Sequence, residues 1–244
     1  MNDIEKMTAT ELWIYSTELE DKGEFEEAFN CMQKASDMGE MLATYYLATY
    51  YEQGIGVEKD LLKAAELYLS VVECREQLIF AGGNESLTPQ CDAEFALGCM
   101  YESGILPNSS IKTAIDWYIR AIIDGVLEIE VYLKMSEFYY NGNGVERDYN
   151  ESAKYLDWGY NTVCGKDERI LGLALKLADK DTSYKIEILE IIADCYRQGI
   201  GTEIDNEKAN EYKEKATVLK VEEDNKIQEE YKQLLLKIPK EKAF

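Results

Sequence analysis

The sequence predicts an all-α protein built from repeated helical hairpins, and three observations support this prediction. A tyrosine is followed three residues later by glycine, and ten residues after that by a small residue, at four places along the chain. A bulky apolar residue and then a small residue come seven and six positions before each of these glycines. The chain also contains only 3 prolines in 244 residues. A motif that recurs in register is the signature of a stacked repeat array. The four anchors are Tyr51-Gly54-Ala64, Tyr101-Gly104-Ala114, Tyr139-Gly142-Ser152 and Tyr196-Gly199-Ala209.

The first predicted unit covers residues 8–39 and has a shorter turn than the units that follow. Gly23 separates its two helical segments, and Ala28, Met32 and Ala35 recur three or four residues apart in the second segment. That spacing places the three side chains on one face of a helix. We therefore expect a simple helical hairpin here.

Four longer units are predicted at residues 40–75, 90–126, 128–161 and 185–217. Each reads as two amphipathic helices joined by a glycine-containing break. In three of them the break is Gly-x-Gly, followed four residues later by Asp60, Asp148 or Asp205. We expect the glycines to supply the positive φ that ends the first helix, and the Asp to cap the second. The unit at 90–126 lacks the second glycine and the Asp, so its turn must close differently.

The columns of the repeat also predict how the helices pack. A small residue six positions before each glycine lets two helices approach closely. The anchor tyrosines are expected to be mostly buried, each between the two helices of its own pair. The bulky apolar column is Leu47, Leu97, Met135 and Ile192, and the small column is Ala48, Gly98, Ser136 and Ala193.

Uneven spacing between the units locates two insertions. Residues 76–89 read as a loop, because Ala81–Ser86 is rich in glycine and polar residues. Residues 162–184 contain the apolar segment Arg169–Ala178, which we expect to form one extra packed helix. Insertions in repeat arrays often lie on a binding side, although a tolerated loop is the simpler interpretation.

Residues 218–240 read as a capping helix with a polar outer face, and a partner-binding or self-associating helix is the alternative. We expect one helical-repeat domain over residues 1–244.

The repeat reads small-x-x-Tyr-x-x-Gly-x-Gly-Val-x-x-Asp-x-x-Lys-Ala in the unit that contains Tyr51, Gly56 and Asp60. This string closely resembles the Sel-one-like repeat, a relative of the tetratricopeptide repeat, over most of residues 40 to 215. The segment Gly23–Ala28 resembles an ordinary tetratricopeptide unit. The resemblance implies an α–α superhelix, a right-handed solenoid of helical hairpins. It also implies that the first helix of each pair lines the concave surface.

Several kinds of catalytic and metal site are excluded by composition. The chain has no histidine, which removes Ser-His-Asp, Cys-His and two-histidine metal chemistry. Its six cysteines include no C-x-x-C pair, so free thiols are expected rather than zinc ligands or a disulfide framework. Catalysis by paired carboxylates stays formally open. With 48 acidic residues in the chain, however, any chosen pair is expected to be a coincidence of the surface. We expect no enzyme, no cofactor and no metal.

The excess of acidic over basic residues indicates which class of partner the protein can bind. A net charge of −22 is unfavourable for binding nucleic acid or an anionic membrane, and it favours a basic protein or peptide. No stretch approaches the ~18 apolar residues of a membrane-spanning helix. The first residues lack a basic region followed by an apolar core, so they do not read as a secretory signal. We expect a cytoplasmic protein.

A candidate binding surface follows from the analogy with tetratricopeptide arrays. Counting from the bulky apolar column gives 20 inward positions, of which nine are Asp or Glu, whereas 48 acids in 244 residues predict about four. Carboxylates with aromatic rings among them suit basic side chains through ion pairs and cation–π contacts. The alternative is that these helices are simply solvated and acidic like the rest of the chain. The predicted protein-binding residues are Trp13, Tyr45, Glu52, Asp92, Phe95, Glu102, Glu130, Glu137, Tyr140, Glu187, Glu190 and Asp194.

Three functions are compatible with these features. The first is a non-catalytic scaffold or adaptor that binds a basic protein or peptide on the acidic, aromatic-lined concave face. The alternative is an immunity or inhibitor protein that neutralises a cationic toxin or nuclease. An enzyme that uses acidic residues is the third and the least favoured.

Overall fold

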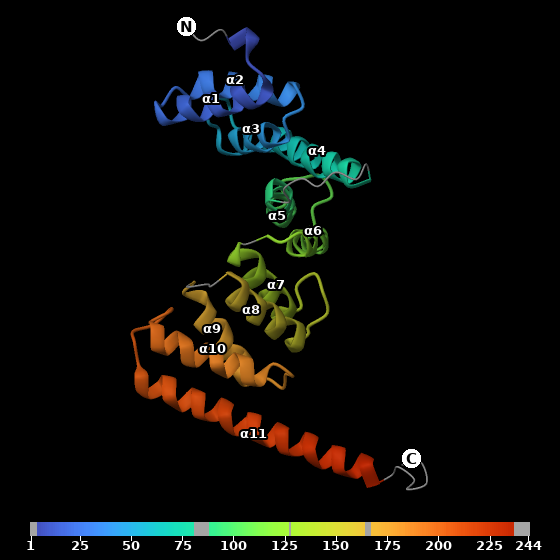
Figure 1. The fold of residues 1–244 in the computed structure, drawn as a ribbon, viewed down its shortest axis with the longest axis vertical. Helices are drawn as coiled ribbons and strands as arrows, with labels where there is room; N and C mark the ends of the chain where they lie inside the picture. Colours follow the sequence, from blue (N-terminus) through green and yellow to red (C-terminus); the bar gives the residue numbers. More distant parts are fainter. Residues whose placement is uncertain (1–3, 81–87, 127, 164–166, 237–244) are drawn as a thin grey trace, which may run out of the picture. The chain divides into compact units, whose positions relative to one another are not determined.

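The computed structural model describes residues 4–80, 88–126, 128–163 and 167–236, and every regular element in these ranges is a helix. Packing contacts divide the chain into two compact units, residues 1–127 and 128–244, and each unit is described by itself (Figure 1). The predicted all-α, helical-repeat class is confirmed. None of the described helices combines the length and apolar character needed to cross a membrane.

The first unit is a stack of three helical hairpins. Each hairpin packs its two helices together, and the second helix of one hairpin packs on the first helix of the next. A short 3₁₀ turn, Ile4–Lys6, precedes them. The pairs are α1 (Ala9–Asp21) with α2 (Phe25–Asp37), α3 (Met41–Gln53) with α4 (Leu61–Phe80), and α5 (Thr88–Glu102) with α6 (Ile111–Ile123).

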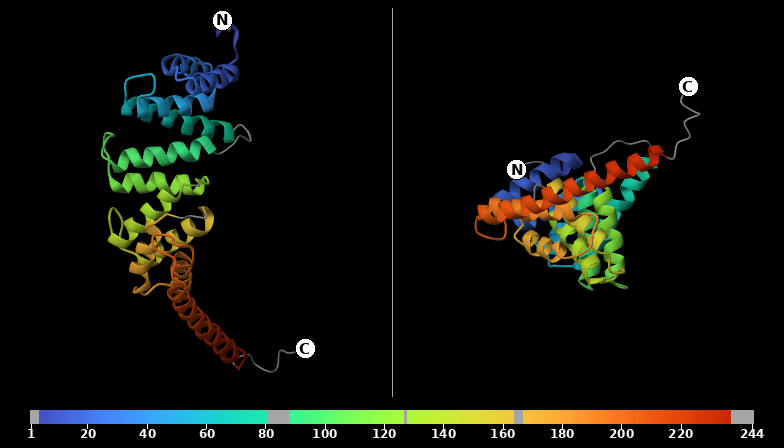
Figure 2. Two further views of the ribbon diagram at one scale, coloured as in Figure 1. Left: turned by 90° about the vertical axis from the view of Figure 1, so that its left-hand side faces the viewer. Right: turned by 90° about the horizontal axis from the view of Figure 1, so that it is seen from below.

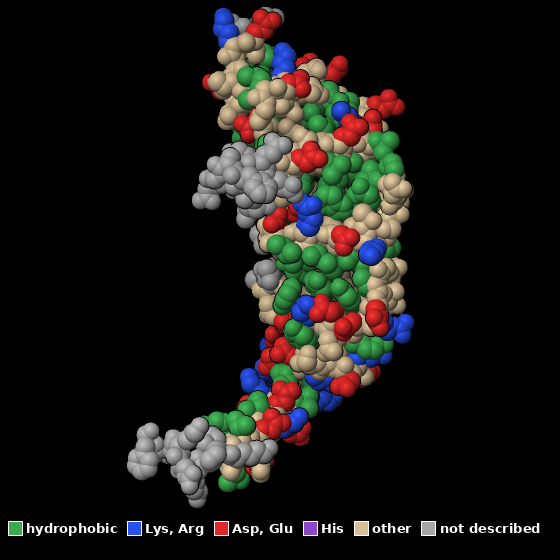
Figure 3. Space-filling model, turned by 90° about the vertical axis from the view of Figure 1, so that its right-hand side faces the viewer, with side chains coloured by type: hydrophobic (Ala, Val, Ile, Leu, Met, Phe, Trp, Pro, Cys, Tyr) green, Lys and Arg blue, Asp and Glu red, His purple; other side chains and the backbone are tan. Residues whose placement is uncertain are grey.

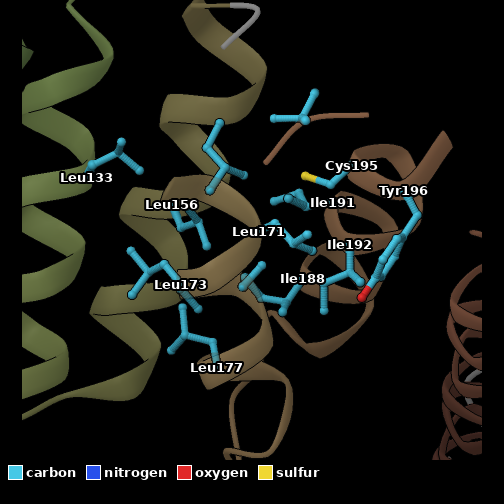
Figure 4. Close-up of a cluster of buried hydrophobic side chains, with 14 of the residues drawn as sticks. Leu133, Leu156, Leu171, Leu173, Leu177, Ile188, Ile191, Ile192, Cys195 and Tyr196 are labelled. Atoms are coloured by element: carbon cyan, nitrogen blue, oxygen red, sulfur yellow. The ribbon is translucent and has the colours of Figure 1, made fainter. Parts of the chain in front are cut away.

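The second unit contains two hairpins and one additional helix. The hairpins are α7 (Ile129–Asn141) with α8 (Tyr149–Val163), and α10 (Lys185–Gln198) with α11 (Asn206–Leu236). Helix α9 (Arg169–Ala178) occupies the residues for which the sequence predicts an extra helix, and it packs chiefly on α10. Figure 4 shows apolar side chains of α7, α8, α9 and α10 converging in the core of this unit.

The three Gly-x-Gly turns close in the same way. Gly54 ends α3 in the left-handed region at φ 79°, and the second glycine of the turn, Gly56, has φ 65°. The Asp60 N–H then donates to the carbonyl oxygen of Tyr51 at 2.9 Å, while the Asp60 carboxylate accepts from the Lys63 N–H at 2.9 Å. Asp148 and Asp205 make the equivalent bonds, and Gly144 and Gly201 have φ 74° and 67°. The predicted roles of the glycines and the capping Asp are therefore confirmed.

The turn between α5 and α6 closes by other means, as its sequence requires. Leu106 is buried beneath it, and Asn108 takes the positive φ of 60°. Asparagine tolerates this conformation better than most residues do. Ser110 replaces the missing Asp as the cap, because its hydroxyl accepts from the Thr113 N–H at 3.0 Å.

The second glycine of the Gly-x-Gly turn also allows a close contact between successive hairpins. A Cβ atom at Gly56 would lie 2.1 Å from the carbonyl oxygen of Phe25, the first residue of α2. A Cβ atom at Gly201 would lie 2.3 Å from the carbonyl oxygen of Glu168, which precedes α9. These two turns therefore need glycine for its small size as well as for its positive φ.

The apolar and small columns of the repeat form the core, as predicted. All four bulky apolar residues are fully buried, and so are the small residues Ala48, Ser136 and Ala193. Ser136 also joins α7 to α8 by a reciprocal pair of bonds, because its hydroxyl donates to the Ser152 carbonyl and the Ser152 hydroxyl donates back. The small column thus brings the two helices of a hairpin into direct contact.

The prediction that the anchor tyrosines are mostly buried is confirmed. Tyr196 is 9% exposed, and Tyr51, Tyr101 and Tyr139 keep only a minority of their surface exposed. Tyr101 stacks on Trp117 with ring centroids 6.4 Å apart. Tyr139 and Tyr196 stack in the same way on Tyr155 and Tyr212 of the second helix of their hairpins, at 5.6 and 5.9 Å. The tyrosines that are fully buried are Tyr50, Tyr68 and Tyr118.

Two further expectations need correction. Residues 76–80 of the predicted loop insertion are helical, because α4 continues to Phe80; residues 81–87 lie outside the described residues. The predicted capping helix does not cap, because every residue from 220 to 234 is exposed. Helix α11 has 31 residues whereas its partner α10 has 14, so the second half of α11 extends past the surface that it was expected to cover.

The cysteines of the described residues are free thiols, as expected. They are Cys31, Cys74, Cys91, Cys99 and Cys195, and the sixth, Cys164, lies outside the described residues. Burial raises the pKa of Cys91 to about 11 and that of Cys195 to about 12. Because a reactive cysteine needs thiolate at neutral pH, these two buried thiols are expected to be inert.

Candidate functional site

The twelve predicted binding residues lie on the first helices of their hairpins and fall into two groups of six. Glu137 is exposed, and the other eleven are half-buried. Trp13, Tyr45, Glu52, Asp92, Phe95 and Glu102 lie on α1, α3 and α5 of the first unit, and Glu130, Glu137, Tyr140, Glu187, Glu190 and Asp194 lie on α7 and α10 of the second.

Aromatic rings form a continuous row across α1, α3 and α4 in the first unit. Trp13 stacks on Tyr46 with centroids 6.3 Å apart, and Tyr46 meets the edge of Tyr45 at 5.4 Å. Tyr45 in turn lies 5.8 Å from Tyr68. Sequence reasoning missed Tyr46, which is 39% exposed, because it lies one residue away from the counted inward position.

Two predicted carboxylates are held in place by buried tyrosines. The Tyr68 hydroxyl donates to Glu52 Oε2 at 2.7 Å, and the Tyr118 hydroxyl donates to Glu102 Oε2 at 2.6 Å. The two bonds are equivalent, because each joins the first helix of a hairpin to the second across 16 residues. Glu and Tyr recur 16 residues apart in these two hairpins, and this recurrence in the sequence could have predicted both hydrogen bonds. These carboxylates are thus preorganised.

Burial and neighbouring acids keep the tyrosines of this region neutral. Burial raises the pKa of Tyr45 well above its usual range, and the negative charges of Asp92 and Glu52 raise it further. Burial likewise raises the pKa of Tyr118, whose hydroxyl stays protonated and able to donate to Glu102. Asp92 of α5 therefore lies close enough to Tyr45 of α3 for its charge to raise the pKa of that tyrosine.

We call Trp13, Tyr45, Tyr46, Glu52, Asp92, Phe95 and Glu102 the aromatic–carboxylate face.

Three of the six predicted residues of the second unit are already paired with cations, and α9 and α11 supply two of these cations. Glu130 forms ion pairs with Arg169 of α9 and with Lys134, and the bond from Arg169 lowers the pKa of Glu130. Asp194 pairs with Arg197, and Lys213 of α11 contacts Glu190 at 2.7 Å.

Helix α9 also covers part of the inward surface of α7. Leu133 lies two residues before Met135 of the bulky apolar column, at one of the 20 counted inward positions. It is only 3% exposed and belongs to the same apolar cluster as Ile170 and Leu173 of α9. The Lys180 ammonium group lies 5.7 Å from the ring centre of Tyr140. The inserted helix therefore fills and neutralises a region that the regular repeat pattern assigns to an open acidic surface.

A buried polar cluster between α5 and α6 is the other concentration of acidic groups in the first unit. The Glu94 side chain has no solvent exposure and receives a bond from Arg120 Nε at 3.2 Å. Gln90 donates to Glu94 at 3.2 Å and to Asp124 at 2.9 Å. Burial raises the pKa of Glu94, and the nearby Asp124 raises it further. The enclosed position of Glu94 fits a structural role, and no group of three acidic or cysteine residues in the described ranges is arranged to hold a metal.

Comparisons with known proteins agree with this architecture. The family model described as "Sel1 repeat" matches residues 22–40, 42–70, 91–126, 129–157 and 192–217. The chain resembles the structure of a protective antigen of uropathogenic Escherichia coli with an SLR fold, at a TM-score of 0.53 and 20% identity. That match covers 88% of this chain and 47% of the antigen, so the chain spans about half of the antigen's length. A Sel1 repeat protein from Oxalobacter formigenes matches at a TM-score of 0.49 and 21% identity, over 84% of each chain. No curated protein matches.

Proposed function

This chain belongs to the Sel1 repeat family, whose members are generally scaffolds for protein–protein interaction, and from that premise we propose that it is a scaffold or adaptor for a protein or peptide with a basic surface. The proposed site is the aromatic–carboxylate face of the first unit. Sel1 repeat proteins are typically non-catalytic, so the proposal involves no reaction and no cofactor.

The observation that carries the proposal is the placement of fixed carboxylates beside a row of aromatic rings. A lysine or arginine side chain that lies over Tyr45 or Tyr46 gains a cation–π contact, and its charge also meets Glu52 or Asp92. Because Tyr68 and Tyr118 already hold Glu52 and Glu102, little side-chain entropy is lost when a partner binds. The net charge of −22 attracts basic partners from a distance.

The contrast between the two units supports this choice of site. Glu130, Glu190 and Asp194 of the second unit are already paired with Arg169, Lys213 and Arg197. Glu52 makes no ion pair within the described residues, and it accepts a hydrogen bond from the neutral hydroxyl of Tyr68. A basic partner therefore gains more from Glu52 than from Glu130, Glu190 or Asp194.

Neutralising the face tests the proposal. The triple variant Glu52→Gln, Asp92→Asn and Glu102→Gln removes three charges but keeps oxygen atoms that accept from Tyr68 and Tyr118. Fluorescence anisotropy with a labelled Arg-rich peptide measures the effect. At about 0.5 kcal/mol for each half-buried charge that a partner pairs with, the Kd is expected to rise about tenfold. Binding of the wild type is also expected to weaken with added salt.

A matched control variant distinguishes the effect of the aromatic–carboxylate face on peptide affinity from the effect of the total charge. Glu222→Gln, Glu223→Gln and Asp224→Asn make the same chemical changes on the exposed half of α11. This variant is expected to bind the peptide like the wild type. An equal loss of affinity in both triple variants would mean that the peptide senses only the total charge, and the proposed site would be wrong.

A narrower form of the same proposal is an immunity or inhibitor protein for a cationic toxin or nuclease. The excess of 48 acidic over 26 basic residues favours this form, because a basic enzyme could be covered by charge complementarity. Inhibition of the enzymatic activity of such a partner, and not binding alone, distinguishes it from a scaffold. Either role is proposed to take place in a reducing compartment such as the cytoplasm, which suits the free thiols of the described residues.

A further inference from the structure

One glutamate position recurs in all three hairpins of the first unit. Acidic side chains are spread over the face of the molecule in Figure 3, so acidity alone does not identify a partner. Glu20, Glu52 and Glu102 each follow a buried small residue by four positions, and each is the last or next-to-last residue of α1, α3 or α5. The same position in the second unit holds Tyr140 and Arg197. We call Glu20, Glu52 and Glu102 the glutamate row.

The place of these glutamates on their helices favours a cation as the ligand. The C-terminal end of a helix carries a partial negative charge, and its last carbonyl oxygens have no partner within the helix. A glutamate there adds a full negative charge at the same end. Glu20 and Glu52 form no ion pair in the part of the chain that the structure describes. A lysine or arginine side chain of a partner would therefore neutralise both the carboxylate and the helix end.

A buried tyrosine lies beside each member of the row, but the first pair differs from the other two. Tyr68 and Tyr118 donate to Glu52 and Glu102. Burial raises the pKa of Tyr50, and the nearby Glu20 raises it further. The Tyr50 side chain is only 1% exposed, yet among the described residues its hydroxyl finds no hydrogen bond of normal length and angle. A bound cation that orders the Glu20 carboxylate would bring this bond to completion.

The spacing of the row determines the spacing of basic residues in the partner. Helix α3 packs directly on α5, and Figure 2 shows the helices of the first unit stacked in layers. Packed helices lie about 8–10 Å apart, so equivalent glutamates on neighbouring first helices are separated by about that distance. A peptide in the polyproline II conformation advances about 9 Å in three residues and completes one turn. Its every third side chain therefore points the same way at the spacing of the row, whereas in a β-strand every third side chain alternates between faces.

The aromatic rings beside the row suit the same backbone conformation. Tyr45 and Tyr46 make ring contacts, but their hydroxyls form no hydrogen bond within the described ranges. A polyproline II backbone has no internal hydrogen bonds, so its carbonyl oxygens can accept from such hydroxyls, and its prolines pack well on aromatic rings. An α-helical peptide has already paired the carbonyl oxygens along its length and gains nothing from these donors.

We propose that the first unit binds a peptide in the polyproline II conformation that carries lysine or arginine at every third residue. One basic side chain pairs with each member of the glutamate row, and prolines between them pack on Tyr45 and Tyr46. The inference rests on the proposed function, because it specifies which basic peptides bind the aromatic–carboxylate face.

Two labelled peptides of one composition test the spacing. Lys-Pro-Pro-Lys-Pro-Pro-Lys places its lysines on one face, whereas Lys-Pro-Lys-Pro-Lys-Pro-Pro does not. Fluorescence anisotropy with the full chain is expected to give a Kd about tenfold lower for the first peptide. Equal Kd values would overturn the inference and leave the proposed function standing. If neither peptide binds more tightly than Gln-Pro-Pro-Gln-Pro-Pro-Gln, the proposed function itself is wrong.

Two further peptides test the conformation. Lys-Gly-Gly-Lys-Gly-Gly-Lys keeps the spacing but must be ordered on binding, so it is expected to bind about tenfold more weakly than the proline peptide. A helical peptide with lysines seven residues apart repeats at about 10.5 Å and is also expected to bind more weakly. Binding of either peptide as tightly as the proline peptide would overturn the polyproline II assignment.

A single variant tests the first member of the row. Glu20→Gln keeps an oxygen atom near Tyr50 but removes the charge, and it is expected to raise the Kd of Lys-Pro-Pro-Lys-Pro-Pro-Lys about two- to threefold. Glu18→Gln makes the same change at an exposed position of α1 and is expected to leave the Kd unchanged. An equal effect of both variants, or no effect of Glu20→Gln, would overturn the three-membered row.

Discussion

Replacing Gly56 with alanine is expected to destabilise the first unit by about 3 kcal/mol. About 1 kcal/mol of this comes from placing an alanine at φ 65°. The larger part comes from overlap, because the new Cβ atom would lie 2.1 Å from the Phe25 carbonyl oxygen. That oxygen belongs to the backbone at the start of α2 and cannot move without shifting the helix. Urea denaturation followed by circular dichroism measures the free energy of unfolding.

Gly104→Ala is the matched control for the Gly56 variant. Gly104 also has a positive φ, 77°, but a Cβ atom there would meet nothing within 4 Å. Its substitution is therefore expected to cost only about 1 kcal/mol, from the backbone conformation alone. If the two variants lose equal stability, the close approach of successive hairpins at Gly56 does not contribute, and our account of the Gly-x-Gly turn is incorrect.

Replacing Tyr118 with alanine is expected to destabilise the first unit by about 3–5 kcal/mol. The ring is fully buried between α5 and α6, so its removal leaves a cavity lined by core side chains. The substitution also removes the hydroxyl that donates to Glu102. The same denaturation experiment measures the loss.

Two comparisons separate the contributions of Tyr118. Tyr118→Phe keeps the ring and is expected to cost about 1 kcal/mol, the net value of one hydrogen bond. Tyr101→Ala removes an anchor tyrosine that is only half-buried, and it is expected to cost less than Tyr118→Ala. A greater cost at Tyr101 than at Tyr118 would contradict the fuller burial of Tyr118 in the structure.

The register of the fold could be predicted from the sequence because the same physical requirement recurs in every unit. A fully buried residue such as Leu47 must be apolar, and a residue at a close helix contact such as Ser136 must be small. The anchor tyrosines were harder to place, since a tyrosine is acceptable both in a core and at its edge. Tyr68 and Tyr118 are fully buried, and their hydroxyls donate to Glu52 and Glu102 across the α3–α4 and α5–α6 hairpins. These two hydrogen bonds were not predicted, because they depend on which side chains of the two helices come into contact.

The candidate site could be predicted only in the part of the chain where the repeats are regular. Counting inward positions found Tyr45, Glu52 and Asp92, which do lie near one another. The same count failed to anticipate that Arg169 of the inserted α9 pairs with Glu130. A repeat pattern describes contacts between regular neighbours, and it contains no information about where an inserted helix packs.

The most direct test of the proposed binding site is hydrogen–deuterium exchange of the full chain with and without the Arg-rich peptide. The account predicts slower exchange in peptides from α1, α3 and α5, which carry the aromatic–carboxylate face. Residues 220–234 of α11 and the acidic residues of α7 and α10 are predicted to exchange at unchanged rates. Protection confined to α11, or to the second helices α2, α4 and α6, would contradict the account.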